Sequence, residues 1–381
     1  MPISPVLRSQ GVYPFARLAQ AANEIEAQGI EIIDCGAGDP RGEAEAFIRE
    51  ALVAALPATS GYPLAQGLPE LRRAIAGWCR RRFGAELDPA TQIIPTLGSK
   101  EAIFSFAQVV LDPESGKDTV VVTEPGYPVP ERGARFAGAE VIRLPLRAPD
   151  FLPDLDLVED EAWDRLALFW LNYPNNPTGA VAPLELYERL AGLARRHGFV
   201  FASDEAYSEL WFDEPPPSAL QLDDLDGVTV FNTLSKRSSM TGYRSGFVAG
   251  DPDIIAALRL FRPSIGTAPQ DFVQRASIVA WGDEGHVERS RERYRRRREI
   301  FLDVFARKGL RVAGSRATMY LWLEVPAGAT SEEFAERLLQ RGVVVAPGSY
   351  LGESGEGYVR LALVPDDEAC RRAAGIFEEA L

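Results

Sequence analysis

The chain has 381 residues, 46% of them hydrophobic, which is enough for an ordinary globular core and, at about 100 to 200 residues per domain, suggests two domains. Its formal net charge of -14 excludes a nucleic-acid surface, because such a surface needs an excess of Lys and Arg to neutralise phosphates. No apolar run approaches the roughly 18 residues needed to span a bilayer, and the N-terminus lacks the cationic start of a signal peptide, so we expect a cytoplasmic protein without membrane contact.

Cysteine and histidine usage argues against two further classes of site. Cys35, Cys79 and Cys370 lie far apart without a CxxC pair, so we expect neither a disulfide framework nor a thiolate zinc site. Two histidines, His197 and His286, leave very little room for a histidine metal site or a Ser-His-Asp triad. We therefore expect no metal and assign both histidines to structural roles.

The first predicted element ends at EIIDCGAGDP, residues 31–40, just before a large α/β domain begins. In that domain, short runs rich in Val, Ile and Phe alternate with helical patterns at 133–138 and 184–198. This alternation favours a mostly parallel sheet with helices on both faces. The runs occupy residues 119–124, 166–172, 199–204, 228–233 and 246–250. We assign the large domain to residues 46–280.

The rest of the chain has the pattern of a smaller α+β domain. A long charged helix at 284–309 is followed by YLWLEV, a helix from Ser331, VVVAPG, YVRLALV and a final helix. The N-terminal segment is expected to pack with these elements, so that the second domain comprises 1–45 together with 281–381. The basic run Arg289–Glu299 is interleaved with glutamates at helical spacing, which indicates a solvated or subunit-facing helix.

Chemical groups follow several predicted strands at the point where each strand ends. Because ligands bind beyond the carboxyl ends of the strands in an open parallel sheet, this edge is where a site is expected. The residues at these positions are Gly126-Tyr127, Asn176 to Gly179, Asp204 to Tyr207, and Ser235-Lys236. An aromatic ring, an amide, a carboxylate, a phenol and an amine are thus expected to converge on one rim.

Lys236 lies in TLSKRSSMTGYRSG, where hydroxyls before it and Arg244 after it can bind a phosphate together. Here the sequence resembles the fold type I, class I and II aminotransferases, whose signature is a serine-rich S-K followed by a glycine and an arginine. NNPTG, DEAY, TLSK, MTGYRSG and VRLAL occur in the family's order and spacing, and the resemblance extends from GAGDP to YVRLALV. It implies the type I fold of transferases that depend on pyridoxal 5'-phosphate (PLP), and a transaminase activity.

The resemblance implies a role for each group around the cofactor ring. Lys236 would hold PLP as a Schiff base and then move a proton between the substrate α-carbon and the cofactor. Asp204 would keep the pyridine nitrogen protonated, which makes the ring an electron sink. Asn176 and Tyr207 would hydrogen-bond the phenolate oxygen, and Tyr127 would stack on the ring. Lys236, Asp204 and Tyr207 are therefore the expected catalytic residues, although each taken singly also fits a structural role.

The cofactor phosphate needs N–H groups and a cation. PTLGSKEAIFSFAQ sets a glycine ahead of an amphipathic helix, whose N-terminal N–H groups and positive dipole end favour an anion. The expected phosphate cradle comprises Gly98, Ser99, Lys100, Thr233, Ser235 and Arg244. Tyr62, in GYPLAQG, resembles the tyrosine that reaches the phosphate from the neighbouring subunit, which implies a homodimer with a shared active site.

Three residues are expected to bind the substrate. Arg360 in YVRLALV matches the arginine that clamps the α-carboxylate with two parallel hydrogen bonds, a geometry that lysine cannot reproduce. Gly38 in GAGDP corresponds to a backbone group at the same carboxylate, and Asn176 completes the set. A dicarboxylic substrate needs a further cation, and the candidates are Arg17, Arg259 and Arg262. The Arg-rich RLFRPS segment favours Arg262 for the distal end of the substrate.

Other functions remain open at this point. A strand, a Gly-x-Gly and a helix in EIIDCGAGDPRGEAEAF suggest a dinucleotide-binding dehydrogenase, but Arg41 stands where the fingerprint wants its third glycine. A PLP-binding regulator would carry a DNA-binding domain, for which the chain has no room before residue 40. A C–S lyase or a decarboxylase fits the same PLP residues, because one fold hosts many reactions.

Three longer stretches bear on the amino donor. Residues 95–110, 124–146 and 261–281 resemble the N-succinyl-LL-diaminopimelate aminotransferases of lysine biosynthesis. This resemblance implies that the chain exchanges the amino group of N-succinyl-LL-2,6-diaminopimelate with 2-oxoglutarate, giving glutamate. Aspartate or an aromatic amino acid is the alternative donor.

Overall fold

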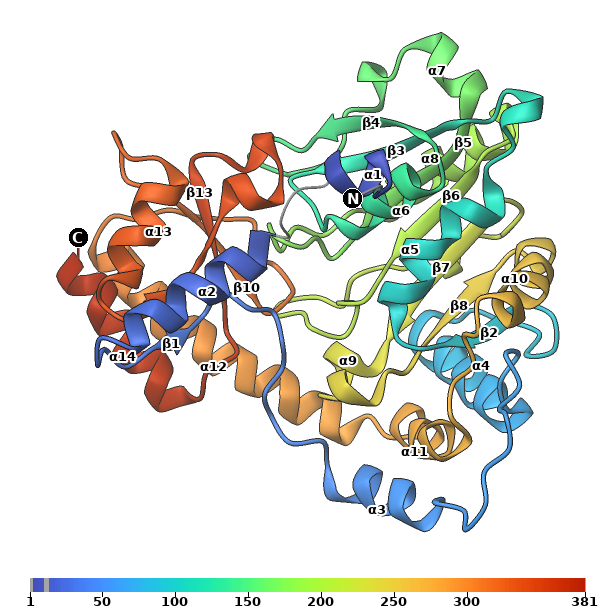
Figure 1. Ribbon diagram of the computed structural model, residues 1–381, viewed down its shortest axis with the longest axis horizontal. Helices are drawn as coiled ribbons and strands as arrows, with labels where there is room; N and C mark the ends of the chain where they lie inside the picture. Colours follow the sequence, from blue (N-terminus) through green and yellow to red (C-terminus); the bar gives the residue numbers. More distant parts are fainter. Residues whose placement is uncertain (1–2, 10–13, 381) are drawn as a thin grey trace.

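A seven-stranded sheet organises the larger part of the computed structural model, which describes residues 3–9 and 14–380 (Figure 1). Its strands lie in the order β2-β8-β7-β6-β5-β3-β4. All neighbours pair in parallel except β8, which is antiparallel to both β2 and β7. The bounds are β2 Ile93–Thr96, β3 Thr119–Glu124, β4 Glu140–Pro145, β5 Leu166–Asn172, β6 Val200–Asp204, β7 Val228–Thr233 and β8 Gly246–Gly250. The prediction of a mostly parallel sheet is confirmed.

Apolar side chains on both faces explain why helices cover this sheet on both sides. Along β5, Leu168 and Trp170 pack into one buried cluster, whereas Phe169 and Leu171 pack into another, because successive side chains of a strand point to opposite faces. The first cluster is closed by α5 Ser99–Val110, α6 Val129–Phe136 and α10 Pro252–Ser264. The second is closed by α3 Ala46–Ala54, α4 Pro69–Phe83, α7 Asp160–Arg165, α8 Leu184–His197 and α11 Asp271–Gly282.

Two features of the large sheet differ from the sequence prediction. The strands β2 and β4 were not predicted: β2 has only four residues and includes Pro95, and the edge strand β4 carries exposed Glu140 and Arg143. The helix predicted at 133–138 is α6, which begins four residues earlier. Pro130 is tolerated there because the N–H groups of a first helical turn have no partner within the helix.

A smaller antiparallel sheet lies beside the large one, with strand order β12-β13-β10-β9. These strands are β9 Val312–Ala313, β10 Tyr320–Glu324, β12 Ala346–Pro347 and β13 Tyr358–Ala362, and the helices around them are α12 Gly285–Arg307, α13 Ser331–Leu339 and α14 Asp367–Ala380. Side chains from α12, α13 and α14 form a separate buried cluster with β10 and β13. This part agrees with the expected α+β pattern.

The N-terminal segment packs with this smaller sheet, as expected (Figure 1). The helix α2 Pro14–Glu26 lies against the C-terminal elements, where Ile25 shares a buried cluster with Leu339 and Val344. The strand β1 Ile33–Asp34 pairs in parallel with β11 Val343–Val344. The short helix α1 Pro5–Ser9 instead contacts α6 of the large sheet. The division of the chain at residues 46 and 280 stays a prediction.

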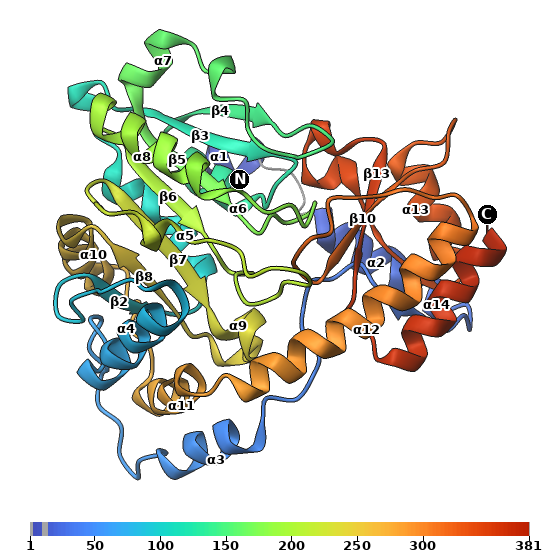
Figure 2. The ribbon, with the colours of Figure 1, turned by 180° about the vertical axis from the view of Figure 1, so that it is seen from behind.

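The arginine-rich helix α12 runs from the neighbourhood of α11 to the smaller sheet, where it lies beside α14 (Figure 2). Arg297 donates to the carbonyl of Leu363 at 3.2 Å and to Asp367 at 2.9 Å, and Arg298 donates to the carbonyl of Ser315 at 3.0 Å. Arg297 and Arg298 therefore bind main-chain carbonyls of the smaller sheet's connections, whereas Arg289 and Arg296 of the same run are exposed, in agreement with a solvated helix. The subunit-facing alternative stays a prediction. No helix among the described residues is long and apolar enough to span a membrane.

Candidate active site

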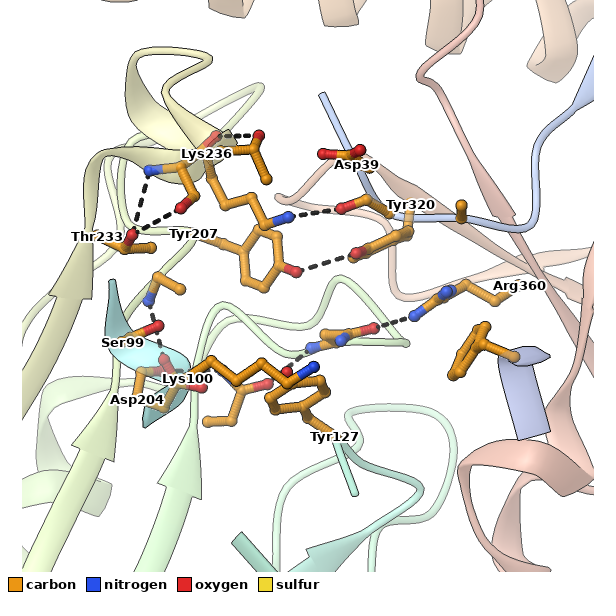
Figure 3. Close-up of a pocket in the computed structure, with 18 of the residues that line it drawn as sticks. Asp39, Ser99, Lys100, Tyr127, Asp204, Tyr207, Thr233, Lys236, Tyr320 and Arg360 are labelled. Atoms are coloured by element: carbon orange, nitrogen blue, oxygen red, sulfur yellow. Dashed lines mark hydrogen bonds between the residues drawn. The ribbon is translucent and has the colours of Figure 1, made fainter. Parts of the chain in front are cut away.

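A cavity of about 540 Å³ opens at the carboxyl ends of β5, β6 and β7, between the two sheets (Figure 3). Residues from distant parts of the chain meet here because the strand ends of a parallel sheet share one edge. The predicted site residues that line the cavity are Gly38, Ser99, Lys100, Tyr127, Asn176, Asp204, Tyr207, Thr233, Ser235, Lys236, Arg244 and Arg360. The convergence on one rim that the strand ends predicted is confirmed.

Lys236 projects into this cavity from α9 Leu234–Arg237, which directly follows β7. The side chain of Thr233 caps this short helix by accepting from the N–H of Ser235 at 3.1 Å. The Lys236 ammonium donates to the carbonyl of Gly38 at 2.5 Å. Burial lowers the pKa of Lys236 to about 8, against the opposing effect of the Asp39 carboxylate. A larger share of this amine is therefore neutral, and nucleophilic, than for an exposed lysine.

Asp204 ends β6 and is only 5% exposed. Its carboxylate accepts from the N–H of Ala206 at 3.2 Å. Burial raises the pKa of Asp204 to about 7, and the Ala206 N–H and the charge of Lys236 offset only part of this effect. A carboxylate in this environment gains most from a protonated nitrogen facing it in the cavity.

An anion cradle lies at the N-terminus of α5. Gly98 is the N-cap residue with φ 75°, and a Cβ there would come within 2.6 Å of the Arg244 guanidinium. Arg244, itself at φ 56°, donates to the carbonyl of Leu97 at 3.0 Å and to that of Thr241 at 2.9 Å. Gly98 thus leaves room for the Arg244 guanidinium beside the N-terminus of α5, where the N–H groups and the helix dipole favour an anion.

Arg360 reaches the opposite side of the cavity from β13 and is 3% exposed. It donates to the side-chain oxygen of Asn176 at 2.8 Å and to the carbonyl of Gly36 at 2.8 Å. Its guanidinium lies 4.4 Å from the centre of the Tyr320 ring and 5.0 Å from that of Phe15. These two rings and two hydrogen bonds hold the guanidinium in place, and its planar array of N–H groups can meet a carboxylate.

Seven residues that line the cavity were not among the predicted site residues, namely Phe15, Ala37, Asp39, Asn172, Ala206, Thr241 and Tyr320. Tyr320 is the first residue of the strand YLWLE, and an aromatic residue in such a strand is typical of the buried core. The only available signal was period-two alternation, but the strand is buried at Tyr320, Leu321, Trp322 and Leu323 alike. Which of its faces meets a cavity is decided by the neighbouring sheet.

The cavity lining does not include Gly98, Tyr62 or the three candidate arginines, Arg17, Arg259 and Arg262. Tyr62 is fully exposed, in a loop outside the cavity. Arg262 is fully buried on α10, where it pairs with Glu101 at 2.9 Å. The hypothesis that Arg262 holds the distal end of the substrate is wrong, because its charge is already committed to Glu101 and it does not line the cavity.

The chain is similar to known proteins over almost its whole length. The sequence pattern of the class I and II aminotransferase family matches residues 30–377. The LL-diaminopimelate aminotransferase of Nitratidesulfovibrio vulgaris is 40% identical over 369 residues, covering 95% of this chain and 94% of that protein. A crystal structure of an aminotransferase from Neisseria meningitidis is 38% identical, with a TM-score of 0.92 over 99% of both chains. A probable N-succinyldiaminopimelate aminotransferase from Thermus thermophilus is 33% identical, with a TM-score of 0.90 over 96% of this chain and all of the other.

Proposed function

Because this chain belongs to the class I and II aminotransferases, which are PLP-dependent, we propose that it transfers the amino group of LL-2,6-diaminopimelate to 2-oxoglutarate in lysine biosynthesis. The name of the Nitratidesulfovibrio relative supports the unmodified diamine as donor. The Thermus structure, whose name specifies the N-succinylated form, supports the succinylated donor as second candidate, which is also the donor that the sequence suggested.

The residues of the cavity fit PLP, which supplies an electron sink for the electrons of the substrate α-carbon. The observation that carries this assignment is the order of groups across one cavity: a buried carboxylate with a raised pKa, an amine with a lowered pKa, and an anion cradle closed by Arg244. These three correspond to the ring nitrogen, the aldehyde carbon and the phosphate of the cofactor. In this assignment Ser99, Thr233 and Ser235 add hydroxyls to the cradle.

Each side chain then has a task. The amine of Lys236 would hold the cofactor covalently and, when free, would take and return the proton at the substrate α-carbon. Asp204 holds a proton on the ring nitrogen, and Tyr127 covers the ring face. Asn176 accepts from Arg360 through its side-chain oxygen, so its amide N–H groups are left to donate to the ring oxygen. Tyr207 is the second donor to that oxygen.

The same hydrogen bond links the substrate end of the cavity to the cofactor end. Arg360 is anchored by Asn176 and by the carbonyl of Gly36, which lies in the same loop as Gly38. Its Nε is buried without a partner among the described residues. A substrate α-carboxylate could accept two parallel hydrogen bonds from the Arg360 guanidinium, one of them from Nε. These bonds would give Nε a partner and would fix the α-carbon next to Lys236.

A donor panel tests the proposed function. Glutamate formation from 2-oxoglutarate is measured with LL-diaminopimelate, its N-succinyl derivative, aspartate and phenylalanine, and we expect the highest kcat/KM with LL-diaminopimelate. Lys236→Ala is the matched control, expected to bind PLP through its phosphate, to lack the visible band of the lysine-linked cofactor and to lose turnover by about 10³-fold or more. A preference for aspartate or phenylalanine would refute the donor assignment, and turnover retained by Lys236→Ala would refute the mechanism.

A further inference from the structure

Tyr320 on β10 contacts three groups of the proposed active site (Figure 3). Its hydroxyl lies 2.9 Å from that of Tyr207, and both side chains are buried. Its ring lies under the Arg360 guanidinium at 4.4 Å. A Cβ on Gly38 would come within 1.9 Å of the Tyr320 hydroxyl, so that hydroxyl can occupy its position only because residue 38 is glycine. Tyr320 therefore touches both ends of the substrate pocket.

The hydrogen bond between the two tyrosines crosses from the small sheet to the large one. Tyr320 belongs to β10, paired through Ala362 with β13, whereas Tyr207 follows β6. The rings meet edge to face, with centroids 5.6 Å apart and an interplanar angle of 65°. Two packed rings and a hydroxyl pair hold the Tyr207 oxygen at one place in the cavity.

Proton counting gives this contact a direction. The two hydroxyls carry two protons, and only one can lie between the two oxygens. Two cations lie over these rings, the Arg360 guanidinium at 4.4 Å from the centre of the Tyr320 ring and the Lys236 amine at 6.0 Å from that of the Tyr207 ring. The nearer charge, that of Arg360, more strongly stabilises the negative charge that builds up on the oxygen of a tyrosine that donates. Tyr320 is thereby favoured as the donor and Tyr207 as the acceptor, and the proton of Tyr207 is left for the cavity.

We propose that Tyr320 is a positioning residue, whose hydroxyl donates to that of Tyr207 and so directs the Tyr207 proton toward the ring oxygen of the bound cofactor. This inference rests on the proposed function, in which Tyr207 donates to that oxygen. A hydrogen bond received from Tyr320 also strengthens Tyr207 as a donor, because chained hydrogen bonds polarise one another.

The pKa of the nitrogen that would link Lys236 to PLP reports this contact independently of turnover. A hydrogen bond donated to the ring oxygen stabilises its negative charge and lowers that pKa. Tyr320→Phe keeps the ring under Arg360 but removes the hydroxyl. The pKa is expected to rise by about 0.5 to 1 pH unit, which corresponds to the free energy of one typical hydrogen bond. The measurement is a pH titration of the visible absorbance of the PLP-loaded protein.

Tyr207→Phe should raise the same pKa by more, and adding Tyr320→Phe to it should produce no further rise, because Tyr320 acts through Tyr207. Tyr187→Phe is the matched control: this buried tyrosine on α8 lies outside the cavity, and its removal should leave the titration unchanged. An unchanged or lowered pKa in Tyr320→Phe, or an additive effect in the double variant, would overturn the role of Tyr320. An unchanged pKa in Tyr207→Phe would instead overturn the proposed role of Tyr207, and that of Tyr320 with it.

Discussion

In the proposed function, the buried carboxylate of Asp204 favours cofactor binding at the expense of the stability of the cofactor-free protein. Its pKa of about 7 in the folded chain lies above the usual value of about 3.9 for aspartate. A carboxyl whose pKa is raised on folding binds its proton more tightly when folded, so it lowers stability as pH rises from about 4 to 7. Above pH 7 the whole of this destabilisation is present.

We therefore expect Asp204→Asn to raise the melting temperature of the PLP-free protein at pH 8, by roughly 2 °C or more, with little gain near pH 4. The amide keeps the size of the side chain but removes the buried charge. Asp39→Asn is the control, since Asp39 lines the same cavity but is exposed, and it should give no gain. Thermal unfolding of both variants at the two pH values measures the difference. A lower melting temperature for Asp204→Asn at pH 8 would contradict the assignment of an uncompensated charge.

At the scale of elements, α10 and α5 are joined by a buried ion pair that supports the cradle from behind. Arg262 is fully buried and binds Glu101 in the first turn of α5, and Glu101 in turn accepts from the N–H of Leu97 at 2.9 Å. Leu97 also provides the carbonyl that Arg244 binds. The basic residue that sequence reasoning assigned to the substrate thus anchors the helix whose N-terminus binds the phosphate in our proposal.

Arg262→Ala should lower the free energy of unfolding by about 3 kcal/mol, because it leaves a partly buried carboxylate without its partner. Because Arg262 does not line the cavity, kcat/KM for the proposed donor should stay unchanged in the folded variant when it is saturated with PLP, although PLP affinity is expected to fall because α5 loses its anchor. Arg189→Ala is the matched control, since its pair with Asp156 is exposed on both sides and is expected to contribute less than about 1 kcal/mol. Urea unfolding and steady-state kinetics together test the assignment. A selective loss of kcat/KM in stable Arg262→Ala would restore a role in substrate binding.

At the scale of the whole molecule, Tyr62 gives the expected homodimer a concrete test. A fully exposed tyrosine beside exposed Leu64 forms an apolar surface of the kind that partners cover. If Tyr62 reaches the phosphate of a second subunit, each active site combines Lys236 from one chain with Tyr62 from the other.

Mixing two inactive variants distinguishes shared sites from separate ones. A dimer of one Lys236→Ala chain and one Tyr62→Ala chain contains one intact site, which pairs the native lysine of the second chain with the native tyrosine of the first. After the two variants are unfolded and refolded together, we expect PLP affinity and turnover to recover in this mixed species, up to one active site per dimer. Activity equal to the mean of the two separate variants would show that Tyr62 does not act across subunits.

The sequence by itself determined the elements and the chemistry at their ends. Four of the five predicted strands match the structure residue for residue, and β6 begins one residue later than predicted, because buried parallel strands are uninterrupted apolar runs that end at polar residues. The order of strand-end motifs was enough to identify the family and therefore PLP. Ten of the twelve predicted site residues in the cavity come from the part of the chain that forms the large sheet, whose parallel strands deliver their carboxyl ends to one edge, whereas Gly38 and Arg360 come from the part that packs with the smaller sheet.

Only the tertiary structure decided which side chains face that cavity from outside these strand ends. Arg262 and Arg360 are both arginines in apolar surroundings, and nothing local distinguishes the one that pairs with Glu101 from the one that lies open to a carboxylate. Tyr320 looks like a core residue along its own strand and becomes a partner of Tyr207 only because the small sheet packs across the large one. The physical reason is that contacts between side chains far apart in sequence depend on how whole sheets pack, and local patterns carry no record of that packing.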